Sequence, residues 1–335
     1  MMKFQGNTWV IVLAAGDGRR LHRLTTDESG VAVPKQFCSL RGGTSLLREA
    51  MQRAEAIASA EHICTVVAGQ HRQWWEPALQ AIDPANIIVQ PRNCGTAHGI
   101  LLPLLHIIQR DPDARLVLLP SDHHVENERV LAAALKRAVR RLRSFSDQVL
   151  LLGIAPEAAD PDLGYIVPGA SVGAEVSTVA RFVEKPTASL ARQLIEGGAL
   201  WNAFIVAACA RTLLELFQAR FPRMVEEMEL AVDLDRSTPN APIATTGLYQ
   251  HLSDVDFSKH VLEGAEPALR VVPVPQCGWS DLGTPVRLAE TLQRRPRGRD
   301  RKNRAYGGAN TPCAGFLNLS LQHARLLAAD AAAPE

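Results

Sequence analysis

Short apolar runs rich in β-branched residues alternate with segments of helical periodicity along the first half of this 335-residue chain. The apolar runs lie at residues 8–16, 62–69, 86–91, 114–123 and 148–154, and the helical patterns at 44–58, 73–82, 95–110 and 128–142. Continuous apolar runs are typical of strands that are buried on both faces. The alternation therefore predicts an α/β fold with a Rossmann-like, mostly parallel sheet flanked by helices.

The second half of the chain is more mixed. It carries extended segments at 164–169 and 177–186, a strand at 199–208, helices within 211–232, and a strand leading into a polar loop at 268–283. Residues 294–304 read "RRPRGRDRKNR", a basic run with Pro and Gly that is typical of an exposed linker. We therefore predict one domain over residues 1–290, followed at 291–335 by a basic linker and a short C-terminal extension.

Composition narrows the class of protein. A formal net charge of +1 gives no global attraction to nucleic acid or to an anionic membrane. The longest apolar stretch, residues 99–108, is about half the length that spans a bilayer, and we see no leader, so a cytoplasmic protein is expected. The six cysteines show neither a C-x-x-C pair nor zinc spacing. Cys38, Cys64, Cys94 and Cys209 are expected to be reduced, as small core or site-lining residues.

The loop "LAAGDGRRL" follows the first predicted strand. Gly16 and Gly18 allow a tight turn that presents main-chain N–H groups to an anion, and Arg19 and Arg20 can bond phosphate oxygens. The loop is not the Rossmann fingerprint, because Leu21 stands where that pattern needs glycine, and the Walker pattern is absent. Taken alone, it is either a phosphate-binding loop or a tight turn with solvent-facing arginines.

Other polar residues also follow predicted strands, where ligands gather in open parallel sheets. Lys35, in "VPKQF", can fold back over the end of the first strand, and Asp122, in "LLPSDHH", ends the fourth. Glu184 and Lys185, in "FVEKP", and Asp281, in "GWSDLG", occupy similar places later in the chain. The two aspartates are candidate ligands of a hard cation, although an aspartate at such a position can also cap a helix.

The segment "QPRNCGTA" follows the third predicted strand and precedes a helix. Asn93, Gly95 and Thr96 can bind a nucleobase edge or a ribose, or they can form only the turn and the helix N-cap. The sequence leaves both interpretations open.

Taken in order, the motifs "LAAGDGRRL", "PKQF", "PSDH", "GYI", "FVEKP", "WNAF" and "GWSDLG" resemble those of the sugar-1-phosphate nucleotidyltransferases. Within that family they are most similar to the branch that acts on mannose-1-phosphate and GTP. The resemblance spans roughly residues 8–290. It implies the nucleotide-diphospho-sugar transferase type of α/β fold, with residues 1–290 as the catalytic domain.

The resemblance also implies roles for particular residues. A nucleotide-binding site is implied at Leu13, Ala14, Ala15, Gly16, Gly18, Arg19, Asn93 and Thr96. A sugar-phosphate site is implied at Gly164, Glu184, Lys185 and Asn202. Asp122 and Asp281 are expected to hold Mg²⁺, and the implied catalytic set consists of Arg20, Lys35, Asp122, Lys185 and Asp281.

The implied reaction suits these residue types. An oxygen of the sugar-1-phosphate attacks the α-phosphorus of GTP or another NTP in line, and pyrophosphate leaves. The nucleophile is already an anion, so the reaction needs positioning and charge neutralisation more than a general base. No nucleic acid or membrane partner is expected, and whether the chain forms a homodimer stays open.

The chain departs from the family pattern at several points. Arg19 stands where the family has threonine, "RNCGTA" separates Thr96 from Asn93, the Gly-Tyr-Gly-Tyr block is reduced to "GYI", and no hexapeptide repeats follow residue 290. Two alternatives therefore stay open. One is the same chemistry with another hexose- or heptose-1-phosphate or another NTP. The other is a non-catalytic, nucleotide-sugar-binding regulatory homologue.

Overall fold

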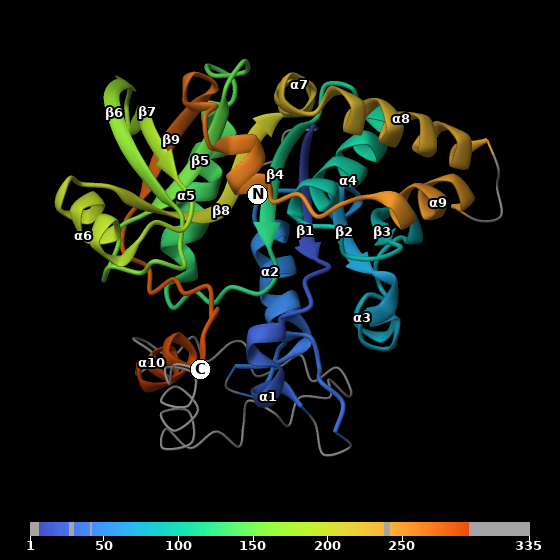
Figure 1. Cartoon of the computed structure of the whole chain (residues 1–335), viewed down its shortest axis with the longest axis horizontal. Helices are drawn as coiled ribbons and strands as arrows, with labels where there is room; N and C mark the ends of the chain where they lie inside the picture. The colour runs from blue at the N-terminus through green and yellow to red at the C-terminus, as the bar shows by residue number, and fades with distance from the viewer. Residues whose placement is uncertain (1–6, 27–29, 41, 238–241, 295–335) are drawn as a thin grey trace.

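The computed structural model describes residues 7–26, 30–40, 42–237 and 242–294 (Figure 1). Its strands form one nine-stranded sheet in the order β3-β2-β1-β4-β8-β5-β9-β7-β6. The strands are β1 (Thr8–Ala14), β2 (Ile63–Ala68), β3 (Ile87–Gln90), β4 (Arg115–Pro120), β5 (Val149–Ile154), β6 (Tyr165–Gly173), β7 (Val176–Val183), β8 (Leu200–Cys209) and β9 (Leu269–Val274). The helices are α1 (His22–Thr25), α2 (Leu46–Glu55), α3 (Arg72–Ala78), α4 (Thr96–Arg110), α5 (Glu128–Arg141), α6 (Ala188–Glu196), α7 (Ala210–Arg220), α8 (Pro222–Arg236), α9 (Ile243–His251) and α10 (Pro285–Gln293).

Strand direction confirms the predicted α/β class and shows one feature that the sequence did not indicate. Strands β1 to β4 are mutually parallel, and β5 pairs parallel with β9. Strand β8, however, lies antiparallel between β4 and β5, and β7 is antiparallel to both β6 and β9. The sequence could not show this reversal, because β8 is almost as continuously buried as the parallel strands beside it.

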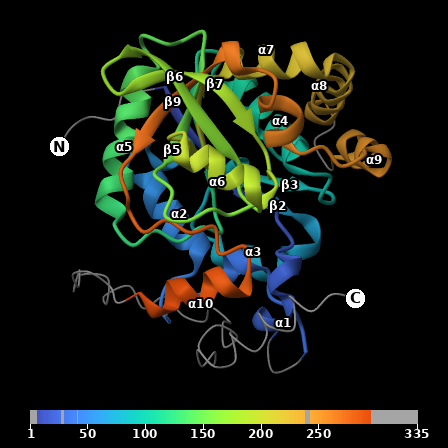
Figure 2. The ribbon, with the colours of Figure 1, turned by 60° about the vertical axis from the view of Figure 1, so that its left-hand side comes forward.

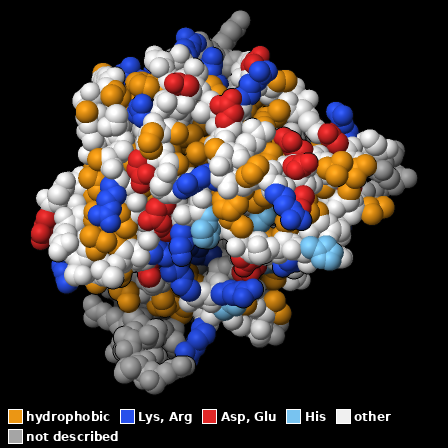
Figure 3. Space-filling view, turned by 45° about the horizontal axis from the view of Figure 1, so that its top comes forward, with side chains coloured by type: hydrophobic (Ala, Val, Ile, Leu, Met, Phe, Trp, Pro, Cys, Tyr) orange, Lys and Arg blue, Asp and Glu red, His pale blue; other side chains and the backbone are white. Residues whose placement is uncertain are grey.

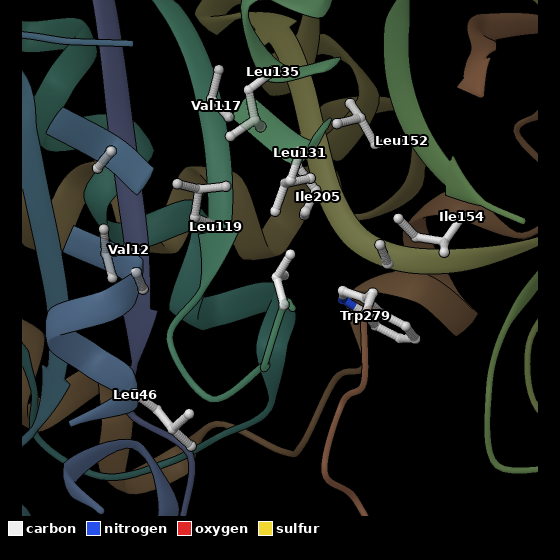
Figure 4. Packing of buried hydrophobic residues seen from close by; sticks show 14 of the residues in the cluster. Val12, Leu46, Val117, Leu119, Leu131, Leu135, Leu152, Ile154, Ile205 and Trp279 are labelled. Atoms are coloured by element: carbon white, nitrogen blue, oxygen red, sulfur yellow. The ribbon is translucent and has the colours of Figure 1, made fainter. Parts of the chain in front are cut away.

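Two hydrophobic cores cover the two faces of the sheet. Side chains alternate along β1, so that Val10 and Val12 belong to one core and Trp9 and Ile11 to the other. The first core packs against α2 and α5, and Figure 4 shows Val12, Leu131 and other members of it. The second core packs against α4, α7 and α8, and Figure 2 shows these helices on the opposite side of the sheet from α2 and α5.

Several elements were not predicted from the sequence. Helix α1 has four residues, too few to show a helical period, and α6, α9 and α10 have nine each. Helix α10 did carry a start signal, because Thr284 caps it and Pro285 occupies its first turn. Pro103 is the eighth residue of α4, so it lies in the interior of the helix rather than in its first turn.

The thiols and the ends of the described chain complete the fold. Cys38, Cys64 and Cys94 are buried, Cys209 is half-buried, and all four are free thiols. No helix of the described ranges is both long enough and apolar enough to cross a bilayer. The predicted boundary at residue 290 falls inside α10, three residues before its end, and the predicted linker beyond Arg294 and the C-terminal extension lie outside the described residues.

Candidate functional site

The candidate site forms where the carboxyl ends of β1 and β4 meet the loop that precedes α10. A two-residue bridge joins this loop to the segment after β4: His124 N donates to Ser280 O at 2.9 Å, and Ser280 N donates to His124 O at 2.9 Å. Asp281 directly follows one side of the bridge, and Asp122 lies two residues before the other. The bridge therefore brings together two aspartates that are 159 residues apart in the sequence.

Lys35 joins the same two segments through its ammonium group. Its Nζ lies 2.8 Å from Asp122 Oδ2 and donates to the main-chain oxygens of Asp281 at 2.6 Å and Leu282 at 3.5 Å. The side chain is only 6% exposed. As the sequence predicted, Lys35 folds back over the end of β1. It does so from a short 3₁₀ helix, Lys35–Phe37.

The residue after Lys35 fixes the loop that follows β1. Gln36 is buried, and its Nε2 donates to Ala14 O at 2.9 Å and to Gly16 O at 3.0 Å. The motif "PKQF" contains Gln36, but the sequence alone does not indicate a role for this residue. A buried amide has to find partners, and the nearby loop carbonyls meet this need.

Burial and neighbouring charges shift the pKa values of both Asp122 and His123. Burial by itself raises the pKa of the Asp122 carboxyl, but Lys35 and His123 outweigh it, so the pKa lies below its usual value. Burial lowers the pKa of His123 to about 4, against the pull of Asp122. His123 is therefore neutral at physiological pH, and it makes an edge-on ring contact with Trp279 at 5.2 Å between centroids.

Asp281 is held by a different set of partners. Its Oδ1 accepts from Gly283 N at 3.1 Å and lies 3.1 Å from Arg287 Nη1. The same Arg287 nitrogen is 2.8 Å from Asp160 Oδ2. Neither Arg287 nor Asp160 was singled out from the sequence, because only the tertiary fold brings α10 next to residue 160.

The donor chemistry at Asp122 and Asp281 fits a magnesium ion. Mg²⁺ is usually bound by one or two carboxylates together with water and substrate phosphates, rather than by a cage made entirely of protein groups. No group of three or more His, Cys, Asp or Glu side chains suited to a metal ion occurs within the described ranges. Asp122 and Asp281 would supply the two carboxylates of such a site.

The glycine loop after β1 is a tight turn with both arginines near solvent. Gly18 has φ +65°, and a Cβ there would lie 3.3 Å from Lys35 Cβ. Arg19 is 82% exposed and pairs with Asp17 at 3.2 Å. Arg20 is 58% exposed and lies 3.7 Å from Asp162 Oδ2. Both guanidinium groups can therefore reach a ligand above the loop, which keeps the phosphate interpretation open.

A cavity of about 230 Å³ opens beside this loop. Its lining comes from the ends of β1, β3 and β4 and the residues after them, from β2, β8 and the start of α4, and from the 3₁₀ helix Lys35–Phe37. The lining residues are Leu13, Ala15, Gly16, Gln36, Val66, Gln90, Asn93, Gly95, Thr96, Gly99, Pro120, Ser121, Asp122, His123 and Phe204. Five of the predicted nucleotide-binding residues are among them, whereas Ala14, Gly18 and Arg19 are not. Around a central hollow in the face seen in Figure 3, Lys, Arg and His side chains gather.

The segment "RNCGTA" forms a turn and also lines the cavity. Asn93 Oδ1 accepts from Gly95 N at 3.0 Å, and Thr96 Oγ1 accepts from Phe257 N at 2.8 Å. Gly95 has φ +87°, and a Cβ there would collide with the main chain of Val255. These residues therefore form a turn, and Gly95 is the N-cap of α4 without a side-chain cap bond, while a contact with base or ribose stays a prediction.

The four predicted sugar-phosphate residues lie close together at the start of β6 and β8 and the end of β7. Asn202 N donates to Gly164 O at 2.8 Å, and Lys185 Nζ lies 3.2 Å from Glu184 Oε1. A Cβ on Gly164 would lie 2.5 Å from Glu184 Oε2, so this approach requires glycine. Burial raises the pKa of Glu184, against the opposing effect of Lys185. Glu184 Oε2 is buried and has no hydrogen-bond partner among the described residues.

Four non-glycine residues of the described ranges have left-handed backbone. Three of them lie around the candidate site, and the fourth, Glu175, lies in the turn between β6 and β7. Lys185, Phe204 and Leu282 adopt the left-handed conformation, with φ values of 47°, 55° and 49°. Such conformations cost non-glycine residues on the order of 1–3 kcal/mol each and are frequent at ligand-binding sites. Lys185 adjoins Glu184, Phe204 lines the cavity, and Leu282 follows Asp281.

Comparison with known proteins gives a consistent result. A model of the nucleotidyl transferase family matches residues 9–295. The mannose-1-phosphate guanylyltransferase of Salmonella muenchen is 30% identical over 281 residues, which cover 82% of this chain and 57% of that protein. The xanthan biosynthesis protein XanB of Xanthomonas campestris pv. campestris (strain B100) is 29% identical over 278 residues, with the same coverage of each. The chain thus spans about 57% of the length of these curated relatives.

A solved structure supports the same grouping. The crystal structure of mannose-1-phosphate geranyltransferase from Thermus thermophilus superposes with a TM-score of 0.72 at 27% identity, covering 88% of this chain and 81% of that one. The family model spans β1 from Trp9 onward, all of β2 to β9, and the motifs from "LAAGDGRRL" to "GWSDLG". The chain belongs to the nucleotidyl transferase family.

Proposed function

We propose that the protein transfers a nucleotidyl group from a nucleoside triphosphate to a sugar-1-phosphate and releases pyrophosphate, with GTP and mannose-1-phosphate as the preferred pair. The observation that carries the proposal is the position of the Lys35 ammonium. It joins the Asp122 carboxylate to the main chain of Asp281 beside a cavity bounded by the glycine loop. The names of the curated relatives support this choice of sugar and nucleotide.

The chain's own residues suit the joining of two polyanions. In the proposed complex, Arg20 binds the triphosphate from the exposed side of the glycine loop. Lys185, which is 53% exposed beside Glu184, binds the sugar phosphate. Lys35 keeps Asp122 and Asp281 in register and adds positive potential beneath the reacting phosphate. Such preorganised charges stabilise a transition state without any general base.

Asp122 and Asp281 would hold the magnesium ion in this proposal. The ion supplies neutralisation of the negative charge on the nucleotide phosphates. Removal of divalent cations with a chelator should therefore stop turnover, and added Mg²⁺ should restore it.

A substrate matrix tests the function. Purified protein with Mg²⁺ is incubated with each of four NTPs against a panel of hexose- and heptose-1-phosphates, and pyrophosphate release is measured. The proposal expects release to be fastest with GTP and mannose-1-phosphate. Faster release with another pair would keep the chemistry but change the substrates. Tight binding of a nucleotide sugar without release from any pair would instead indicate the regulatory homologue.

A further inference from the structure

Arg287 lies among three carboxylates next to the proposed cation site. Its Nη1 is 2.8 Å from Asp160 Oδ2 and 3.1 Å from Asp281 Oδ1, and its Nη2 is 3.6 Å from Asp162 Oδ2. The side chain is only 12% exposed. Charges in such surroundings are screened by salt much less than surface charges are. The chain itself thus counters the charge of Asp281.

The second proposed cation ligand is countered in the same way. Lys35 Nζ is 2.8 Å from Asp122 Oδ2. Each of the two carboxylates therefore has a resident cation within 3.1 Å. Arg287 also faces Asp160 and Asp162, so a free divalent ion approaches a pair of aspartates whose charge is partly countered. The resident cations repel that ion, and at separations of a few ångströms this repulsion is worth kilocalories even in a polar environment.

Both Arg287 and the main chain hold the Asp281 carboxylate. The Asp281 carboxylate is also held by the main chain, because Gly283 N donates to its Oδ1 at 3.1 Å. A Cβ on Gly283 would collide with Asp281 Oδ2 and lie 2.8 Å from Arg287 Nη2, so the glycine lets these groups come together. Loss of the guanidinium would leave the bond from Gly283 in place and remove one positive charge.

The cluster lies where this chain departs from the family pattern. Asp160 and Asp162 come just before the shortened "GYI" block, and the hydroxyl of Tyr165 in that block fixes the loop. This hydroxyl accepts from Asp160 N at 2.8 Å and donates to Asp160 O at 2.9 Å. Asp162 is also the partner of Arg20 at 3.7 Å. The cluster thus connects the proposed cation ligand Asp281 with the arginine proposed to bind phosphate.

We propose that Arg287 is a resident counter-ion of Asp281 that weakens binding of a free divalent cation and makes cation binding depend on the nucleotide. The inference rests on the proposed function to the extent that Asp281 is a cation ligand. A triphosphate brings enough negative charge to offset Lys35 and Arg287, so the cation enters together with the nucleotide. The protein alone then binds the ion weakly.

Binding of Mn²⁺ to the full chain, followed by the electron paramagnetic resonance signal of the free ion, tests this proposal. Without nucleotide, Arg287→Gln should bind Mn²⁺ at least about tenfold more tightly than the wild type, because glutamine keeps hydrogen-bond donors but lacks the charge. Arg287→Lys should stay close to the wild type. With GTP present, the difference in Mn²⁺ affinity between the wild type and Arg287→Gln should become smaller.

Two controls assign the effect to the site. Arg223→Met removes one positive charge from a side chain that is 88% exposed on α8, and it should not change Mn²⁺ affinity. Addition of Asp281→Asn to Arg287→Gln should abolish the gain. If Arg287→Gln does not fold, Asp160→Asn offers an independent arm. It frees Arg287 from its nearest partner and should weaken Mn²⁺ binding.

The proposal is overturned if folded Arg287→Gln binds Mn²⁺ no more tightly than the wild type, or if its gain survives Asp281→Asn. Unchanged or tighter binding by Asp160→Asn would also overturn it. These outcomes are separate from the fate of the proposed function. Pyrophosphate release by the wild type with unaltered Mn²⁺ affinity in Arg287→Gln removes only this inference. Tighter Mn²⁺ binding without any pyrophosphate release removes only the proposed reaction.

Discussion

At the scale of single residues, the ammonium group of Lys35 makes polar contacts with two separate segments of the chain. Its ammonium has three N–H donors, and the structure provides three acceptors for them, from two segments far apart in the sequence. One acceptor is the main-chain oxygen of Leu282, a residue with left-handed backbone. Lys35 thus helps to hold a strained turn in place as well as supplying positive charge.

Replacement of Lys35 by Met should therefore affect stability as well as turnover. Loss of the ammonium removes the cation paired with Asp122 and the donor to two carbonyl oxygens, which should lower the free energy of unfolding by about 2 kcal/mol. Urea denaturation measures this change, and the pyrophosphate assay should show turnover abolished. Lys136→Met, on the exposed side of α5, is the matched control and should leave both nearly unchanged. A fully stable, active Lys35→Met protein would contradict the assigned role.

Gly164→Ala should act selectively on the sugar-phosphate side. The added methyl group would lie 2.5 Å from Glu184 Oε2 and 3.2 Å from Asn202 Cβ, so the side chain of Glu184 has to move. We expect the KM for sugar-1-phosphate to rise several-fold, with the KM for NTP nearly constant. Steady-state kinetics with each substrate varied in turn measures both constants. An equal rise in both would place Gly164 outside the sugar-phosphate site.

At the scale of elements, the start of α4 depends on close packing of its main chain against that of Val255. Ala97 N donates to Val255 O at 3.0 Å, and Val255 N donates to Cys94 O at 3.2 Å. Gly95 lies between these bonds with φ +87°. The cavity wall formed by Asn93 and Thr96 is therefore fixed by a contact between main chains.

Gly95→Ala should break this contact. A Cβ there would lie 2.7 Å from Val255 N, and the backbone conformation is unfavourable for alanine, so we expect a loss of about 2–4 kcal/mol in unfolding free energy. The control is Gly247→Ala in α9, where a Cβ meets nothing within 4 Å. That change should be neutral or stabilising by up to about 1 kcal/mol. Equal stability of the two variants in urea denaturation would contradict the prediction.

The packing of α2 against α5 should make stability depend on pH. Burial raises the pKa of Glu49 from 4.5 to about 7, although Arg53 opposes this and Glu128 adds to it. The folded state then binds the proton more tightly than the unfolded state does, so stability falls as pH rises from about 4.5 to about 7. Glu49→Gln should remove this part of the fall. Urea midpoints measured across that range should diverge, with the variant gaining on the wild type as pH rises.

How far the elements could be predicted depends on the local signal. Strand–helix alternation identified the five strands β1 to β5 and the helices α2 to α5, because each has a clear apolar pattern. Direction is not encoded in that pattern, so the reversal of β8 was not found. Likewise, Asp122, Lys35 and Asp281 were recognised from their places after strands. Arg287 and Gln36 act only through partners that the fold brings close.

At the scale of the whole molecule, the two cores share one sheet. Ile100 of α4 and Leu135 of α5 are both fully buried but pack on opposite faces. Adjacent residues of β1 face both cores, so disruption of one face disturbs the strands that carry the other. We therefore expect the described domain to unfold as one cooperative unit.

Ile100→Ala and Leu135→Ala test this expectation. Each should cost about 2–5 kcal/mol, because each leaves a cavity in a closely packed core. Tryptophan fluorescence and far-ultraviolet circular dichroism should report the same shifted transition in both variants. Trp9 belongs to one core and Trp201 to the other, so separate unfolding of the two faces would appear as two transitions.

The place of β8 in the sheet has a consequence for how the chain folds during synthesis. Strands β4 and β5 do not pair with each other, and β8 lies between them. The ribosome must therefore synthesise residues 200–209 before β4 and β5 can be joined in one sheet, long after β1 to β4 have emerged. Until then, the edges of β4 and β5 that pair with β8 are open, and β5 has a second open edge until β9 is made. Unpaired apolar edges of this kind invite aggregation. The nascent chain should depend most on chaperones while residues 155–199 are being made.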